Sequence, residues 1–229
     1  MTIKQALQFG HNALKDSVPT SLTDSKVLMG FVLDVPREQL QIRLHQILTE
    51  GQFKKYKKYL SLRQKNIPIA YIVGYKEFYN IPFYVDERVL IPRPETEILV
   101  ERAIKELEEH AAKKRVLIDV GTGSGNIAIS IARNIPLLSV IATDLSKQAV
   151  DVAKRNARTF EASQQIEFRV GSLLEPISVS DFDGKFVLLT ANLPYVPRRY
   201  NVQPDVHHEP EMAIFGGDDG PELYEEFFA

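Results

Sequence analysis

The sequence contains no cysteine. Disulfide bonds, thiolate nucleophiles and cysteine-ligated metal sites are therefore excluded. No apolar run approaches the roughly 18 to 20 residues that a membrane-spanning helix needs. The amphipathic N-terminus also lacks the continuous apolar core of a secretory signal. These absences favour a globular protein of the reducing cytoplasm that does not enter membranes, and we expect it to be a monomer.

Acidic residues are few in the first third of the chain and outnumber basic ones in the rest, although the net charge is only −2. Residues 1–76 carry 12 Lys and Arg against 5 Asp and Glu, whereas the remainder carries 16 against 25. This sign change indicates two units with different surfaces. Residues 54–65 hold six positive charges and no negative one. That segment is either an ordinary solvated helix face or a weak contact with RNA or a protein partner.

The first sixty-odd residues have helical periodicity and no strand pattern. We therefore predict a small helical bundle over residues 1–67. Tyr56 and Tyr59 are expected in its core rather than as stacking platforms for bases. The expected helix starts are marked by Thr2, by Thr23 with Asp24, and by Pro36, and the third helix is expected to end at Gly51.

The pattern changes at Pro68. Residues 68–94 are rich in β-branched and aromatic residues and predict one or two hairpins that connect two units. Residues 95–229 begin with an amphipathic helix and then alternate strands with helices, which predicts an α/β domain with a parallel sheet. A fourth strand at an open edge would normally be followed by more strands, so we expect this domain to be incomplete. The expected elements are helices Glu95–His110, Asn126–Arg133 and Ser146–Phe160, and strands Arg115–Val120, Ser139–Thr143, Ile166–Val170 and Lys185–Ala191.

A glycine-rich loop, Asp119-Val-Gly-Thr-Gly-Ser-Gly125, follows the first strand and opens a helix. Its glycines allow close approach of a ligand, and the helix N-terminus favours an anionic group. Asp144 ends the next strand, where a carboxylate can accept both hydroxyls of a ribose. The G-x-G-x-G spacing favours S-adenosylmethionine over a dinucleotide. Asp119 either orients the loop or contacts the methionine amino group.

A second loop, Asn192-Leu-Pro-Tyr195, follows the fourth strand directly. The Asn192 side-chain oxygen and the Leu193 carbonyl can accept the two N–H groups of a planar amide or exocyclic amine. Pro194 stiffens the loop, and Tyr195 offers a flat face to such a group. No strong general base is needed if the proton leaves after methyl transfer. The pattern therefore predicts methylation of a planar nitrogen, and it does not separate glutamine from adenine.

At this point the sequence resembles the release factor glutamine methyltransferases over essentially its whole length. The resemblance rests on PIAYIVGYKEFY and VLIPRPETEILVE, then on DVGTGSGNIAI, NLPYVP and HEPEMAIFGGDDGPELY. It implies a Rossmann-like class I methyltransferase fold behind a helical substrate-recognition domain. It also implies S-adenosylmethionine as cofactor and the glutamine of the Gly-Gly-Gln loop of peptide chain release factors as substrate.

The resemblance carries site roles onto matching positions of this sequence. Asn192, Leu193, Pro194 and Tyr195 would grip the glutamine amide. The cofactor would be bound by Asp119, Gly121, Thr122, Gly123, Ser124, Gly125, Asp144, Leu173 and Asn192.

Three departures from the family pattern bear on activity. The family's usual tetrapeptide is N-P-P-Y, and Leu193 replaces its first proline, so φ is no longer locked there. After the third strand the family often has an acidic residue followed by an aromatic one, where this chain has Ser172 and Leu173. Leu173 can still pack on adenine, but a carboxylate contact to its amino group is lost. The family also continues through further strands of the sheet.

Two other functions compete with glutamine methylation. N-L-P-Y is also the spelling of rRNA adenine dimethylases, which makes an RNA or DNA adenine methyltransferase the alternative. A third possibility is a cofactor-binding remnant without turnover. His207, His208 and Glu209 resemble a metal cluster on paper, but adjacent histidines in a strand point opposite ways, so we expect no metal. Glu209 with Pro210 is expected to shape the substrate loop.

Overall fold

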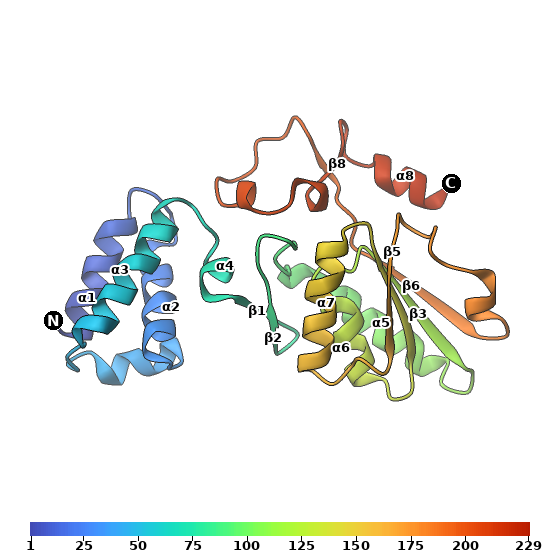
Figure 1. The fold of residues 1–229 in the computed structure, drawn as a ribbon, viewed down its shortest axis with the longest axis horizontal. Helices are drawn as coiled ribbons and strands as arrows, with labels where there is room; N and C mark the ends of the chain where they lie inside the picture. Colours follow the sequence, from blue (N-terminus) through green and yellow to red (C-terminus); the bar gives the residue numbers. More distant parts are fainter. The chain divides into compact units, whose positions relative to one another are not determined.

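The computed structural model describes all 229 residues, and the chain divides into two compact units (Figure 1). The helical unit comprises Met1–Gly74 together with Gln203–His208. The sheet unit comprises Tyr75–Val202 and Glu209–Ala229. The division after Gly74 lies beyond the boundary expected at residue 67. Its cause is a short helix, α4 (Ile69–Val73), whose Val73 packs into the core of the helical unit.

The helical unit is a bundle, as the sequence predicted. It contains α1 (Ile3–Leu14), α2 (Ser21–Leu33), the 3-10 helix η1 (Arg37–Arg43), α3 (Glu50–Gln64) and α4. Thr2 caps α1 in a capping box with Gln5, which confirms the expected start. Tyr56 is fully buried and Tyr59 packs against the same core, so both are core residues as predicted.

Two helix boundaries differ from the sequence prediction. The third expected helix is only the 3-10 helix η1, and Gly51 does not end it. Gly51 lies in the first turn of α3, because Thr49 and Gln52 form a capping box there that starts a helix. The helix α2 is preceded by Thr20 rather than by Thr23 and Asp24. The preference of these residues for caps was outweighed by packing within the bundle.

Asp24 has a different role from the predicted cap. It is buried in α2 and accepts a hydrogen bond from Nε of buried Arg63 at 2.7 Å. The same guanidinium donates to the Ile67 carbonyl at 3.2 Å and lies 3.4 Å from Asp205. This interaction explains why Gln203–His208 belongs to the helical unit. It also removes one positive charge of residues 54–65 from the surface.

The sheet unit is built on four parallel strands in the order β5-β4-β3-β6. Their limits fall within one residue of the predicted ones, and the alternation with helices is confirmed. An antiparallel hairpin, β1–β2, precedes them, whereas the first part of the expected connector is α4 instead of a strand. The elements are β1 (Tyr75–Phe78), β2 (Ile81–Tyr84), η2 (Pro94–Thr96), α5 (Glu97–Glu109), β3 (Arg115–Val120), α6 (Asn126–Asn134), β4 (Ser139–Asp144), α7 (Lys147–Thr159), β5 (Ile166–Val170), η3 (Val179–Phe182) and β6 (Phe186–Ala191).

Alternate residues of the central strand face two different apolar clusters. Leu117 packs with residues of α5, α6 and α7 on one face of the sheet. Val116 and Ile118 face the other side, where Leu193 and the last helix, α8 (Glu222–Phe228), contribute apolar contacts. Because β3 lies between β4 and β6, its carboxyl end is the switch point at which ligands bind in open parallel sheets.

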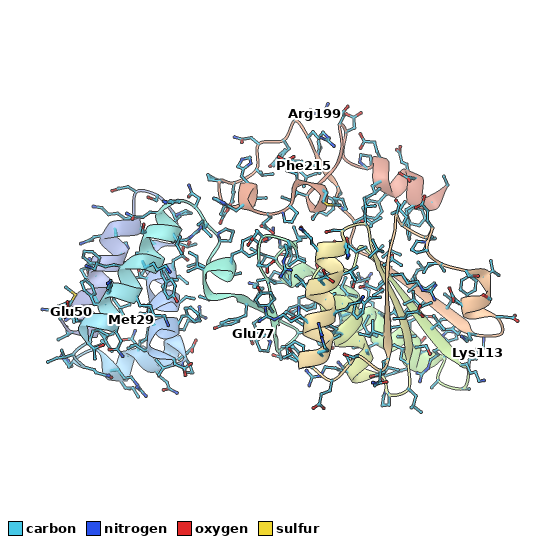
Figure 2. The ribbon with its side chains drawn as sticks, in the orientation of Figure 1. Met29, Glu50, Glu77, Lys113, Arg199 and Phe215 are labelled. Carbon is cyan, nitrogen blue, oxygen red and sulfur yellow. The ribbon has the colours of Figure 1, made fainter.

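The segment after β6 is mostly irregular. It contains the short parallel pair β7 (Val196–Pro197) and β8 (Phe215–Gly217), the 3-10 helices η4 (Val206–His208) and η5 (Glu211–Ala213), and then α8. Phe215 in β8 is labelled among the side chains in Figure 2. Further strands beyond this segment stay a prediction. No helix of the chain combines the length and the apolar character required to cross a bilayer.

Candidate active site

A cavity lies at the carboxyl ends of the sheet strands, at the switch point beside β3. It is formed entirely by the sheet unit, and its lining is more apolar than polar. Such a mixture is typical of sites for small molecules with an aromatic ring and a few polar groups. The lining comes from residues 87–90, 92–93, 120–124, 126–127, 143–146, 148–149, 171–173, 192–194 and 212–213, and from Pro210 and Leu223.

The glycine loop forms one wall of this cavity. Gly121 and Gly123 have φ values of +71° and +54°, which favour glycine. A Cβ on Gly123 would meet no atom within 4 Å, so the backbone here is open to a ligand. Gly125 does not line the cavity. A Cβ there would lie 2.9 Å from Cδ1 of Ile129, so this glycine permits close packing of the helix that follows.

Asp144 ties the glycine loop to the start of α7. One carboxylate oxygen accepts the Gly123 N–H and the other accepts the Ser146 N–H, each at 2.8 Å. Burial raises the pKa of Asp144, and these two backbone N–H groups oppose the shift. Each oxygen keeps a second lone pair for a ligand hydroxyl. The residues present therefore fit a bound ribose, while the same carboxylate also orders the loop.

Asp119 lies beneath the loop and outside the cavity. It is completely buried and accepts hydrogen bonds from Thr122 Oγ1 at 2.7 Å and Thr190 Oγ1 at 2.8 Å. Burial raises the pKa of Asp119 to about 6, against the lowering effect of the two hydroxyls. Of the two roles considered for Asp119, this geometry favours the orientation of the loop. Its side chain fastens the glycine loop to β6.

The Asn192–Tyr195 loop follows the neighbouring strand β6 and contributes Asn192, Leu193 and Pro194 to a second wall of the cavity, next to the glycine loop. The Asn192 side-chain amide donates to Thr96 Oγ1 at 3.3 Å, and its own oxygen has no partner within the protein. The Leu193 carbonyl also accepts no hydrogen bond from the protein. Two acceptors are therefore available on adjacent residues. Tyr195 does not line the cavity and is 65% exposed, which differs from the flat wall expected at that position.

The glycine-rich segment 216–220 packs directly against the backbone of this loop. A Cβ on Gly216 would clash with the carbonyl groups of Pro194 and Gly220. Gly220, at φ +109°, brings its own Cα against the Tyr195 carbonyl. The acceptor loop and this segment thus approach at a distance that only glycine permits.

Glu209 joins two motifs that are far apart in the sequence. Its buried carboxylate accepts the Ile91 N–H at 2.9 Å and an Nη2–H of Arg93 at 2.7 Å. Ile91 and Arg93 belong to VLIPRPETE, and Glu209 belongs to HEPEM, so one carboxylate joins two distant segments that both contribute residues to the cavity lining. Glu209 is thereby committed to these partners, and no group of three His, Asp or Glu side chains is arranged to hold a metal ion.

Two family models match this chain. The PrmC N-terminal domain matches residues 5–74, and the ribosomal protein L11 methyltransferase (PrmA) matches residues 100–193. The first match ends where the helical unit ends, at Gly74. The second spans all four strands of the parallel sheet, the glycine loop and the first two residues of the acceptor loop.

Curated relatives decide the family. A release factor glutamine methyltransferase of Dictyoglomus turgidum is 37% identical over 229 residues, covering 99% of this chain and 79% of the relative. This chain belongs to the release factor glutamine methyltransferase family. Another member, from Aliivibrio fischeri, is 40% identical over 199 residues, covering 86% of this chain and 68% of the relative.

The fold agrees with family membership. The catalytic domain of hMettl16, solved in complex with the MAT2A 3′UTR hairpin 6, aligns with a TM-score of 0.50 at 16% identity. That alignment covers 79% of this chain and 62% of the other. It concerns the fold alone, and it confirms the predicted class I methyltransferase architecture. As a member of this family, the chain is an S-adenosylmethionine-dependent methyltransferase.

Most of the site residues expected for this methyltransferase lie together at the cavity. Asp119, Gly125 and Tyr195 are the three that do not line it. Those that do are Gly121, Thr122, Gly123, Ser124, Asp144, Leu173, Asn192, Leu193 and Pro194.

Sequence reasoning missed three polar residues of this methyltransferase site. Thr96 contacts Asn192, Thr190 contacts Asp119, and Tyr224 contacts the Leu193 backbone. Thr190 lies in an otherwise apolar strand, which is a signal that could have suggested a buried partner. Thr96 and Tyr224 carry no such signal, because their partners lie far away in the sequence.

Proposed function

We propose that this chain transfers a methyl group from S-adenosylmethionine to the side-chain amide nitrogen of a glutamine in a peptide chain release factor. The observation that carries the proposal is the pair of unpaired acceptors, Asn192 Oδ1 and the Leu193 carbonyl, on residues that line the cavity next to the glycine loop. The printed names of the relatives supply the substrate class.

The acceptor loop would orient the amide nitrogen of the substrate toward the methyl group. An amide nitrogen is a poor nucleophile because its lone pair is delocalised into the carbonyl. Asn192 and Leu193 would accept its two N–H groups and turn the nitrogen toward the cofactor side, an arrangement that removes orientational entropy from the reaction. The contact of the Asn192 side-chain amide with Thr96 Oγ1 occupies its nitrogen and would leave its oxygen for the substrate.

The cofactor would be held by the wall that the glycine loop forms. S-adenosylmethionine would supply the electrophilic methyl of its sulfonium. The bond from that methyl to sulfur would break as its bond to the amide nitrogen forms, S-adenosylhomocysteine would leave, and the nitrogen would lose one proton to solvent. Asp144 would accept the ribose hydroxyls, Gly121 and Gly123 would permit close approach, and Leu173 would pack on the adenine. Ser124 and Thr122 contribute backbone to the same wall.

Methyl transfer with isotope-labelled S-adenosylmethionine tests the proposal. The full chain is incubated with a release factor, with the same factor carrying Gln→Glu in its Gly-Gly-Gln loop, and with total RNA. Label should enter only the unchanged factor and map to the glutamine by peptide mass spectrometry. Label in RNA alone would overturn the proposal in favour of adenine methylation, and Asn192→Ala should abolish transfer in either case.

A cofactor-binding remnant without turnover is tested in the same preparation. S-adenosylmethionine at a concentration well above its Kd should raise the melting temperature. A shift in Tm without label in any acceptor would favour the remnant. The monomeric state, the cytoplasmic location and a weak RNA contact through residues 54–65 stay predictions. Lys54, Lys57 and Lys58 of that segment are exposed, whereas Arg63 is buried.

A further inference from the structure

The acceptor loop is held by a hydrogen bond at Leu193, the residue whose φ angle no proline ring restricts. The Leu193 backbone N–H donates to the Tyr224 hydroxyl at 3.2 Å, across a separation of 31 residues. Tyr224 lies in α8 and does not line the cavity. The contact is therefore not part of the ligand-binding surface, although it involves the central peptide unit of that surface.

The peptide group between Asn192 and Leu193 lies between the two proposed acceptors. One acceptor is the Asn192 side chain, and the other is the Leu193 carbonyl. Rotation about φ of Leu193 would move the second acceptor relative to the first. A proline at this position would fix φ, but it would have no N–H to donate. Leucine leaves φ free and provides the donor.

The Leu193 side chain supports the same arrangement. It is 3% exposed and packs in a cluster that includes Leu223, Tyr224 and Phe227 of α8. Its Cδ2 would lie 3.2 Å from a Cβ on Gly121, so it also touches the glycine loop. Apolar packing restrains the side chain, whereas the hydrogen bond restrains the peptide plane.

We propose that Tyr224 is a positioning residue that sets the acceptor geometry by accepting the Leu193 N–H. The inference rests on the proposed function of the loop and adds a group outside the cavity to it. Partial burial raises the pKa of Tyr224 further above neutrality, so the group that accepts this N–H at neutral pH is the uncharged hydroxyl. The Tyr224 hydroxyl thus restrains the Leu193 backbone, as the ring of a proline would at the same position.

A double-mutant cycle between Tyr224→Phe and Leu193→Pro tests this role. Phenylalanine preserves the ring and its packing. Since one intramolecular hydrogen bond is at stake, Tyr224→Phe should lower kcat for release-factor methylation about three- to tenfold. The Kd for S-adenosylmethionine and the melting temperature should change little. In the Leu193→Pro background, which has no N–H to lose, Tyr224→Phe should have almost no effect.

Amide hydrogen exchange of Leu193 measures the same bond without reference to activity. In protein labelled with nitrogen-15, Tyr224→Phe should raise the exchange rate of this amide at least about tenfold. Tyr200→Phe is the matched control, because Tyr200 is largely exposed and its hydroxyl bonds no residue of the protein. It should change neither exchange nor kcat.

Three results would overturn the inference. They are an equal loss of kcat from Tyr224→Phe in both backgrounds, no loss in the parent, or unchanged exchange at Leu193. If Leu193→Pro does not fold, the exchange rate decides alone. If the parent protein methylates no glutamine, the proposed function fails, while the exchange experiment still tests whether Tyr224 restrains the loop.

Discussion

The two walls of the cavity are constructed in different ways. The cofactor wall is local: Gly123 and Asp144 are 21 residues apart, within one strand–helix–strand unit. The acceptor wall is assembled from distant segments, because Asn192 meets Thr96 across 96 residues and Arg93 meets Glu209 across 116. A local wall can be recognised from a short motif. A wall built from distant segments depends on the whole sheet unit, and it should be the more sensitive of the two to remote substitutions.

Asp119 connects the two walls, and its titration should have the largest effect on stability. Its folded pKa of about 6 lies above the ordinary value of 3.8, so the folded chain binds this proton more tightly. Its contribution to stability is therefore present at low pH and is lost as pH rises through this interval. Two pKa units correspond to about 3 kcal/mol.

Urea unfolding of the parent and Asp119→Asn at pH 4 and pH 7 measures this effect. The asparagine does not titrate, so the difference in unfolding free energy between the two proteins should shift by about 2 kcal/mol between pH 4 and pH 7, to the disadvantage of the parent at pH 7. The other titrating groups are the same in both proteins, so their contributions to the unfolding free energy cancel in this difference. A difference that does not depend on pH would show that Asp119 is charged throughout and would weaken its role as a buried link.

Gly216→Ala should damage the acceptor wall alone. The new Cβ would clash with two backbone carbonyls, one of them from Pro194, and neither can rotate away as a side chain could. Displacing the loop should lower kcat/KM for the release factor about 100-fold, since misplacement of about 1 Å has that cost in other enzymes. Calorimetry should find the Kd for S-adenosylmethionine within about threefold of the parent.

Gly51→Ala is the control for the glycine substitution. A Cβ on Gly51 meets no atom within 4 Å, and the residue lies in a helix, so alanine should be neutral or stabilise by up to about 1 kcal/mol. Equal losses of cofactor binding and methyl transfer in Gly216→Ala would contradict the separation of the two walls.

Asp144→Asn should damage the cofactor wall in the complementary way. Asparagine keeps one acceptor oxygen but turns an N–H₂ group toward either Gly123 or Ser146, so one backbone N–H loses its partner. The Kd for S-adenosylmethionine should rise about 30-fold, since about 2 kcal/mol is lost. At saturating cofactor, kcat should recover most of its parent value. A kcat that stays low at saturation would mean that both walls had moved.

Glu209→Gln should have the smallest effect of the four. Glutamine can still accept one hydrogen bond, but Arg93 loses its charged partner. We expect kcat/KM to fall about tenfold, near the value of one charge-assisted hydrogen bond. The exposed pair Arg199–Asp219 is the control, and Asp219→Asn should change kcat/KM less than twofold, as is usual for surface ion pairs. Equal losses of kcat/KM at both pairs would show that the Arg93–Glu209 contact does not help to position the acceptor wall.

The same contrast explains what sequence could predict. Strands such as Arg115–Val120 were found because apolar runs bounded by glycine are local signals. Asp144 was found because it ends a strand at a known topological position. Gly51 and Asp24 were misassigned because capping preference is weak beside packing in the bundle. The Leu193–Tyr224 and Arg93–Glu209 contacts leave no trace in periodicity, since each depends on where two separate segments end in space.

The chain passes between the two units three times, after Gly74, after Val202 and after His208. A unit attached by one linker can be exchanged between homologues or removed by a single proteolytic cut. Here a cut after Gly74 would leave Gln203–His208, a part of the helical unit, still joined covalently to the sheet unit at both of its ends, while residues 1–74 would be held to that segment only by non-covalent contacts such as Arg63–Asp205. Expression of residues 75–229 alone would leave Asp205 in Gln203–His208 without its partner Arg63. The helical unit is therefore not an interchangeable module, and chimeras should be designed with the Gln203–His208 segment taken from the same parent as α3.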